Sequence, residues 1–250
     1  TTLFRSRVLR DRKAELPESA NGRVKALRAL FTFHSREHDG HNPARDVERL
    51  KSKRGGFPAW TVDDIAKYED RHPIGTKARL ALALLLFTGF RRSDVVDLGR
   101  QHVRNGWIRK RLHKGRNSNP VTLEIPMLPE LEAVISASPC GDLTFLVTEY
   151  GRPFTAAGFG GWFRTRCDEA GLHDLSAHGL RKAGATIAAE RGATPHQLAA
   201  IFGWSGLQQP ERYTRTASRR RLAEQSMHLI GPTVLPVGPN AVKKSDGSTG

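Results

Sequence analysis

Several features that mark whole classes of protein are scarce in this sequence. The two cysteines, Cys140 and Cys167, lie far apart and form no C-x-x-C pair, which argues against a disulfide framework and indicates a reducing compartment. The longest apolar run, Leu80 to Phe87, is too short to span a bilayer, and no signal peptide is visible. We therefore expect a soluble, cytoplasmic protein with no membrane partner.

Signatures of several catalytic classes are also absent. The sequence has no P-loop, no H-E-x-x-H motif and no cluster of carboxylates that would indicate another mechanism. His34, His38 and His41 have a spacing that could serve a metal, but no cysteine or acidic partner completes a site, and His34 fits the apolar face of a helix. We expect neither a metal nor a cofactor.

Acidic residues are few relative to basic ones. Forty Lys and Arg residues stand against 25 Asp and Glu, which gives a formal net charge of +15 and a pI near 10.6. A protein this basic usually binds a polyanion, and nucleic acid is the commonest one. A merely basic protein, such as one associated with ribosomes or membranes, remains the alternative. The 250 residues allow one large domain or two modest ones.

Residues 1–55 predict a small, basic, helical segment. Helices are expected over residues 4–15 and 19–38, followed by a linker at Lys51–Gly56. Up to residue 57 there are fourteen Lys and Arg against seven Asp and Glu. Two helices provide too little core for an independent domain, so we expect only part of one.

Residues 56–230 predict a mainly helical domain with a small antiparallel sheet. Thr61, with an acidic residue three positions later, is typical of a helix start. After residue 101 the apolar period changes to two, and Asn105-Gly106 indicates a hairpin within three antiparallel strands. Other helices are expected at Lys77–Phe87, from Pro129, over Ala156–Ala170 and over Ala217–Ile230. The Pro-, Gly-, Ser- and Lys-rich tail, residues 231–250, is expected to be disordered.

The most informative spacing lies between residues 178 and 213. His178 and Arg181 are three apart, and with Ser176 as the N-cap they point from one face of a first helical turn. Such a turn suits an anion, because free N–H groups and the helix dipole add to the guanidinium. Two helices are expected, one ending at Gly192 and one starting after Thr194-Pro195. They are followed by Phe202-Gly203-Trp204 and, nine residues past Trp204, by Tyr213.

Four blocks, in this order, resemble the tyrosine recombinases, or phage integrase family. They are Thr88-Gly89-Phe90-Arg91-Arg92-Ser93-Asp94, in which Ser93 is expected to cap the next helix; Lys114 in a hairpin turn; His178 with Arg181; and Gly203-Trp204 followed by Tyr213. The resemblance covers about residues 58–230, with a weaker match over residues 20–50. Trp204 stands where histidine is more usual in the family, and Asp94 stands where glutamate is.

The resemblance implies a site and a reaction. Tyr213 would attack a DNA phosphodiester and form a 3′-phosphotyrosyl link, with Arg91 and Arg181 holding the phosphate. His178 would accept the phenol proton and Lys114 would protonate the leaving 5′-hydroxyl. Two further residues complete the set: Trp204 would position the phosphate or pack beside it, and Asp94 would support the catalytic residues from behind.

The resemblance also implies partners. Residues 1–55 would be the last part of a helical core-binding domain that clamps double-stranded DNA. Four copies would act on two DNA sites and exchange the helix at Ala217–Ile230, and accessory DNA-bending proteins remain open as further partners. A bacterial, phage or mobile-element origin and a location at the nucleoid would follow.

Two other functions remain open on the residues alone. A type IB topoisomerase shares this chemistry but relaxes supercoils by itself. A non-catalytic DNA-binding protein could keep the same fold. The first is disfavoured by the G-W and T-G-x-R-x-S pattern, and the second by the complete set of catalytic residue types.

Overall fold

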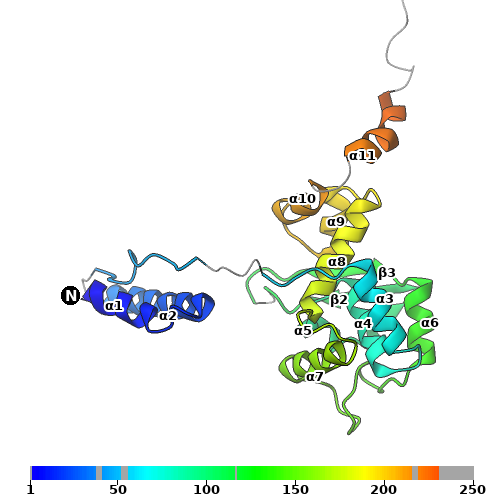
Figure 1. The fold of residues 1–250 in the computed structure, drawn as a ribbon, viewed down its shortest axis with the longest axis horizontal. Coiled ribbons are helices and arrows are strands. Elements are labelled where there is room, and N and C mark those ends of the chain that lie inside the picture. The colour runs from blue at the N-terminus through cyan, green and yellow to red at the C-terminus, as the bar shows by residue number, and fades with distance from the viewer. Residues whose placement is uncertain (1, 38–40, 52–55, 116, 216–218, 231–250) are drawn as a thin grey trace, which may run out of the picture. The chain divides into compact units, whose positions relative to one another are not determined.

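Two units make up the chain, residues 1–56 and residues 57–250 (Figure 1). The computed structural model describes residues 2–37, 41–51, 56–115, 117–215 and 219–230. The tail predicted over residues 231–250 lies outside the described residues, and so does His38. Among the described residues, no group of three His, Cys, Asp or Glu side chains is placed to hold a metal ion.

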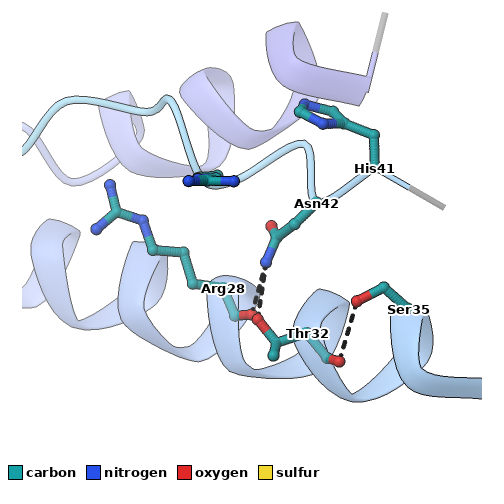
Figure 2. A pocket seen from close by; sticks show the side chains of 6 residues that line it. Arg28, Thr32, Ser35, His41 and Asn42 are labelled. Carbon is teal, nitrogen blue, oxygen red and sulfur yellow. Dashed lines mark hydrogen bonds between the residues drawn. The ribbon is translucent and has the colours of Figure 1, made fainter.

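The first unit contains α1 (Thr2–Asp11) and α2 (Pro17–Glu37), which pack against each other. Residues 41–50 run back along α2 and are fixed to it by polar side chains. Arg28 donates hydrogen bonds to the carbonyls of Ala44 and Val47 at 2.9 and 2.6 Å. Asn42 donates to the Arg28 carbonyl at 3.0 Å, beside a pocket that opens between the two segments (Figure 2). Arg28 therefore serves the local fold of this unit.

The second unit is mainly helical, and it carries one small antiparallel sheet, as the sequence predicts. Its helices are α3 (Val62–Arg71), α4 (Lys77–Thr88), α5 (Arg92–Val95), α6 (Pro129–Ala137), α7 (Ala156–Glu169), α8 (Ala177–Glu190), α9 (Pro195–Phe202), α10 (Gln208–Thr214) and α11 (Arg219–Ser226), with 3₁₀ turns at Arg100–His102 and Met227–Ile230. No helix in the described ranges is both long and apolar enough to cross a membrane.

The sheet consists of β1 (Val103–Arg104), β2 (Trp107–Arg111) and β3 (Thr122–Pro126), in that order. Asn105 and Gly106 join the first two strands with φ angles of 50° and 75°, the left-handed conformation that a type I′ turn needs at both positions. Ile108 faces Ile125 across the second pair of strands, and both are buried. One face of the sheet therefore closes the hydrophobic core.

Helix α4 lies at the centre of this core and contacts α5, α6, α7 and α8. Leu80, Leu82, Leu84 and Leu85 are all fully or almost fully buried, which explains why the helix has no polar face. The helix ends at Gly89, whose φ of 61° places it in the left-handed region. The chain then turns directly into α5.

Helix starts agree with the sequence prediction in some places and not in others. The capping box of α3 is present: Thr61 accepts from the Asp64 amide at 3.1 Å, and Asp64 accepts from the Thr61 amide at 2.8 Å. The prediction that Ser93 caps α5 is wrong. Arg91 occupies the N-cap, because the chain is extended at Arg91 and becomes helical immediately afterwards.

Candidate active site

The first turn of α8 carries His178 and Arg181. Ser176 stands at the N-cap in extended conformation, but the prediction that its hydroxyl caps the helix is wrong: no side-chain bond forms within the described residues. Instead its backbone carbonyl accepts from the Gly179 amide at 2.9 Å and from the Trp60 indole at 3.0 Å. The start of α8 is therefore held through the Ser176 carbonyl and not through its hydroxyl.

Arg181 contacts residues from two of the other sequence blocks, the one that contains Gly89 and the one that contains Trp204. Only 5% of the residue is exposed, and its guanidinium donates to the carbonyls of Gly89 and Phe202, the latter at 2.5 Å. The guanidinium also lies over the Phe202 and Trp204 rings, 5.3 and 5.2 Å from their centroids. Burial and the nearby positive charge of Arg91 lower the pKa of Arg181 to about 10, so it stays charged at neutral pH.

Tyr213 is the outer member of an aromatic stack. The Phe202 and Trp204 rings lie 4.9 Å apart at 21°, and the Trp204 and Tyr213 rings lie 5.7 Å apart at 10°. Gly203 lets the chain turn between the first two rings, with a φ of 60° at the end of α9. Burial raises the pKa of Tyr213, and the positive charges of Arg181 and Arg212 oppose that rise. Its phenol is therefore protonated at neutral pH and needs a proton acceptor to become a nucleophile.

His178 is exposed, and the Phe57 ring lies edge-on to it at 5.2 Å. Desolvation of the part of the imidazole that the protein covers lowers the pKa of His178, and four positive charges lower it further. These charges belong to Lys182, Arg181, Arg91 and Arg92. The imidazole is thus kept neutral at pH 7, the form that can accept a proton. Arg91 itself is half-buried at the start of α5.

Lys114 lies in the turn between β2 and β3, where its side chain is exposed. Within the described part of the chain, no hydrogen bond or ion pair links it to the other predicted site residues. The structure therefore brings Arg181, Trp204 and Tyr213 into contact, and it leaves Lys114 on a separate element.

Two carboxylates hold the residue next to Lys114. Asp94 is fully buried and accepts from the His113 amide at 2.6 Å. Asp97 accepts from the His113 imidazole at 2.9 Å and forms an ion pair of 2.7 Å with Lys110, which is only 4% exposed. Sequence reasoning identified Asp94 but not the Asp97, Lys110 and His113 contacts. These residues follow no motif spacing, because they meet only when the hairpin folds against α5.

The profile of the phage integrase family matches residues 59–220, which contain every predicted site residue. This chain belongs to the phage integrase family. It is 25% identical over 222 residues to the tyrosine recombinase XerD of Listeria monocytogenes serovar 1/2a, covering 82% of this chain and 73% of that protein.

Solved integrase structures share the fold. A lambda integrase dimer bound to a COC′ core site superposes with a TM-score of 0.67 at 18% identity, covering 81% of this chain and 75% of that one. A lambda integrase tetramer bound to a Holliday junction superposes with a TM-score of 0.64 at 17% identity, covering 77% and 60%. The mainly helical fold with its small sheet is therefore that of this family.

Proposed function

We propose that this member of the phage integrase family is a site-specific tyrosine recombinase that cleaves and rejoins double-stranded DNA through a 3′-phosphotyrosyl link on Tyr213. The observation that carries the proposal is the contact chain from Arg181 through Trp204 to Tyr213. It brings a cation, an indole donor and a phenol from different elements into one place. Such a group matches what the displacement of an alkoxide from a phosphodiester requires.

Arg91 and Arg181 are proposed to hold the reacting phosphate. Charge grows on the non-bridging oxygens during the displacement, so forked and permanently charged donors suit this role. Two N–H groups of Arg181 donate hydrogen bonds to the Gly89 and Phe202 carbonyls, and these bonds fix the plane of the guanidinium. Its other N–H groups are proposed to face the phosphate. The Trp204 indole, a single donor, is proposed to contact a phosphate oxygen.

Proton transfer is assigned to His178 and Lys114. His178 is proposed to accept the phenol proton, because its lowered pKa keeps it neutral at pH 7. Lys114 is proposed to protonate the leaving 5′-hydroxyl, and DNA binding would place the hairpin end that carries it. The bond energy would stay in the phosphotyrosyl link, so the reaction needs no ATP, metal or cofactor.

The partners are proposed by analogy with the relatives. Residues 1–55 would act as part of a DNA clamp, and residues 56–230 would act as the catalytic domain. The lambda integrase tetramer on a Holliday junction supports four copies working on two DNA sites. The element exchanged between copies would be the stretch predicted as a helix at Ala217–Ile230, which includes α11 and the 3₁₀ turn after it. The location would be the bacterial nucleoid.

Replacing Tyr213 by Phe tests the proposal. Tyr213→Phe should abolish covalent attachment to DNA, since the nucleophile is lost, while DNA binding stays close to wild type because no charge changes. The measurement is adduct formation on a nicked suicide substrate, separated on a denaturing gel, with fluorescence anisotropy as the binding control.

Three other outcomes would contradict the proposal, and two of them would indicate a different function. An adduct that persists in Tyr213→Phe would refute the assignment. Supercoil relaxation by the wild-type protein without strand exchange would indicate a topoisomerase. Tight DNA binding with no adduct in the wild-type protein would indicate a non-catalytic DNA-binding protein.

A further inference from the structure

The second unit begins with a segment, Phe57–Trp60, that lies against the first turns of α8. The Lys182 ammonium donates to the Phe57 carbonyl at 2.5 Å. The Trp60 indole donates to the Ser176 carbonyl at 3.0 Å. The Phe57 ring lies edge-on to the His178 ring at 5.2 Å. Two hydrogen bonds and one ring contact therefore fix this segment beside the candidate base.

Gly179 allows the close approach. A Cβ atom at this position would lie 2.4 Å from the Pro58 carbonyl oxygen and 2.8 Å from a carbon of the Trp60 indole. Neither backbone nor a buried indole can move aside cheaply, so only glycine fits here. Ser176, Gly179 and Lys182 are spaced three apart and share the helix face that receives the segment. His178 lies directly beside this face.

The two ends of the segment differ in burial. Trp60 is 4% exposed and packs its ring against Tyr68 and Phe163, with ring centroids 5.5 and 6.2 Å apart. It anchors the segment in the core. Phe57 is 57% exposed, so burial in the core does not explain its position. Among the described residues, its ring packs against that of His178.

We propose that Phe57 is a positioning residue for His178: its ring holds the imidazole in one orientation and shields one edge of it from water. Pro58 and Trp60 fix the backbone that carries Phe57. The catalytic meaning of this contact rests on the proposed function, because it requires His178 to accept a proton. The contact itself does not depend on that function.

The shielding has a predictable electrostatic effect. Burial and four positive charges, from Lys182, Arg181, Arg91 and Arg92, lower the pKa of His178. Losing the Phe57 ring would admit water to the imidazole and screen those charges. The charged form would then be less disfavoured, so the pKa of His178 would rise. A larger fraction of the imidazole would be protonated below neutral pH, and less would remain to accept a proton.

The test is an NMR titration of His178 in the full chain, with the resonance assigned by a His178→Gln variant. Phe57→Ala should raise the pKa of His178, and Phe57→Tyr should leave it at the wild-type value because the ring edge is kept. Phe57→Leu keeps bulk without the aromatic edge and should fall between them. Tyr150→Ala, an aromatic residue of the same unit that is 89% exposed, is the matched control and should change nothing.

Single-turnover cleavage at several pH values provides the second readout. In Phe57→Ala the acidic limb of the rate profile should move to higher pH by the same amount, while the general fold, followed by circular dichroism, stays intact. An unchanged His178 titration in Phe57→Ala, or an equal shift in Tyr150→Ala, would overturn the inference. If the wild-type protein does not cleave DNA, the proposed function is refuted. A shifted His178 titration in Phe57→Ala would still support the positioning contact.

Discussion

At the scale of single residues, the Tyr213 side chain packs against a residue from outside its own helix. Its ring lies almost parallel to that of Trp204, and Trp204 also lies under the Arg181 guanidinium. Arg181 in turn is fixed by the Gly89 and Phe202 carbonyls. Trp204 therefore links Arg181 to Tyr213, and its ring offers both a packing surface and an N–H donor.

Substitutions of Trp204 separate these two roles. Trp204→Phe keeps an aromatic ring for the stack but loses the indole N–H, so cleavage should slow by the worth of one hydrogen bond, about 0.5–1.5 kcal/mol. Trp204→His keeps one donor and should retain more activity. Trp204→Ala removes the stack and should be the slowest of the three. Single-turnover cleavage rates measure this series.

A different result for Trp204→Phe would be informative. If Trp204→Phe cleaves as fast as wild type while Trp204→Ala is inert, Trp204 acts by packing alone. The proposed role of Trp204 as a donor to phosphate would then be withdrawn.

At the scale of elements, the end of α4 sets the geometry of the site. Gly89→Ala should destabilise the protein, because φ is 61° there and the new Cβ would lie 2.4 Å from the Phe202 ring. We expect a loss of about 1–3 kcal/mol in the free energy of unfolding, together with slower cleavage, since the Gly89 carbonyl holds Arg181. Urea unfolding and single-turnover rates measure the two effects.

Gly161→Ala is the matched control for Gly89→Ala. Gly161 lies within α7, and a Cβ there meets nothing within 4 Å. Alanine should stabilise this helix by about 0.5–1 kcal/mol and leave cleavage unchanged. A Gly89→Ala protein as stable as Gly161→Ala would contradict our account of the turn after α4.

The stability of the hairpin that carries Lys114 should depend on Asp97. Asp97→Ala leaves Lys110 buried without its carboxylate and frees the His113 imidazole. We expect a loss of about 1–3 kcal/mol in the free energy of unfolding, less than for a fully buried pair because the Asp97 side chain is 45% exposed. Chemical unfolding measures it, with Glu124→Ala on the exposed side of β3 as the control.

The contribution of Asp97 should also depend on pH. Burial raises the pKa of Asp97, but hydrogen bonds from Lys110 and His113 outweigh it and leave the pKa below 3.8. Since the folded-state pKa is depressed, the stabilisation is fully present above pH 3.8 and is lost as the pH falls through the folded-state value. The gap in stability between wild type and Asp97→Ala should therefore narrow in acid. A constant gap would contradict the ion pair.

Local signals predicted some elements well and others poorly. The capping box at Thr61 and the Asn105-Gly106 turn are set by neighbours in the sequence, so the sequence revealed both. Ser93 and Ser176 both look like N-cap residues in the sequence. In the structure Arg91, not Ser93, is the N-cap of α5, and at the start of α8 the Ser176 carbonyl, not its hydroxyl, accepts a hydrogen bond. The conformation of the backbone at Arg91 decided the first case, and a contact with the distant Trp60 accompanies the second. A short motif reports neither.

The candidate site likewise contains residues that the sequence motifs predict and residues that they do not. The family motifs revealed the residues that would touch DNA, because the chemistry requires those types in that order. They did not reveal Phe57, Asp97 or Lys110, which contact the site residues or their neighbours across gaps of up to 121 positions in the chain. Supporting contacts of this kind depend on which surfaces meet after folding.

At the scale of the whole molecule, the charge of +15 should control DNA binding. Each phosphate neutralised by a cation contributes a slope of about −0.9 in log K against log salt, so affinity should fall steeply between low and physiological salt. Fluorescence anisotropy with mixed-sequence double-stranded DNA measures the slope. A slope near zero would mean that the positive charge does not serve DNA binding.

The contact between Phe57 and His178 also bears on how the protein can be shortened. The family profile begins at residue 59, so a fragment trimmed to that boundary would keep every proposed catalytic residue. It would nevertheless lack the ring beside His178 and the carbonyl that Lys182 binds. A catalytic fragment that reproduces the chemistry of the full chain should therefore start at Gly56 or earlier.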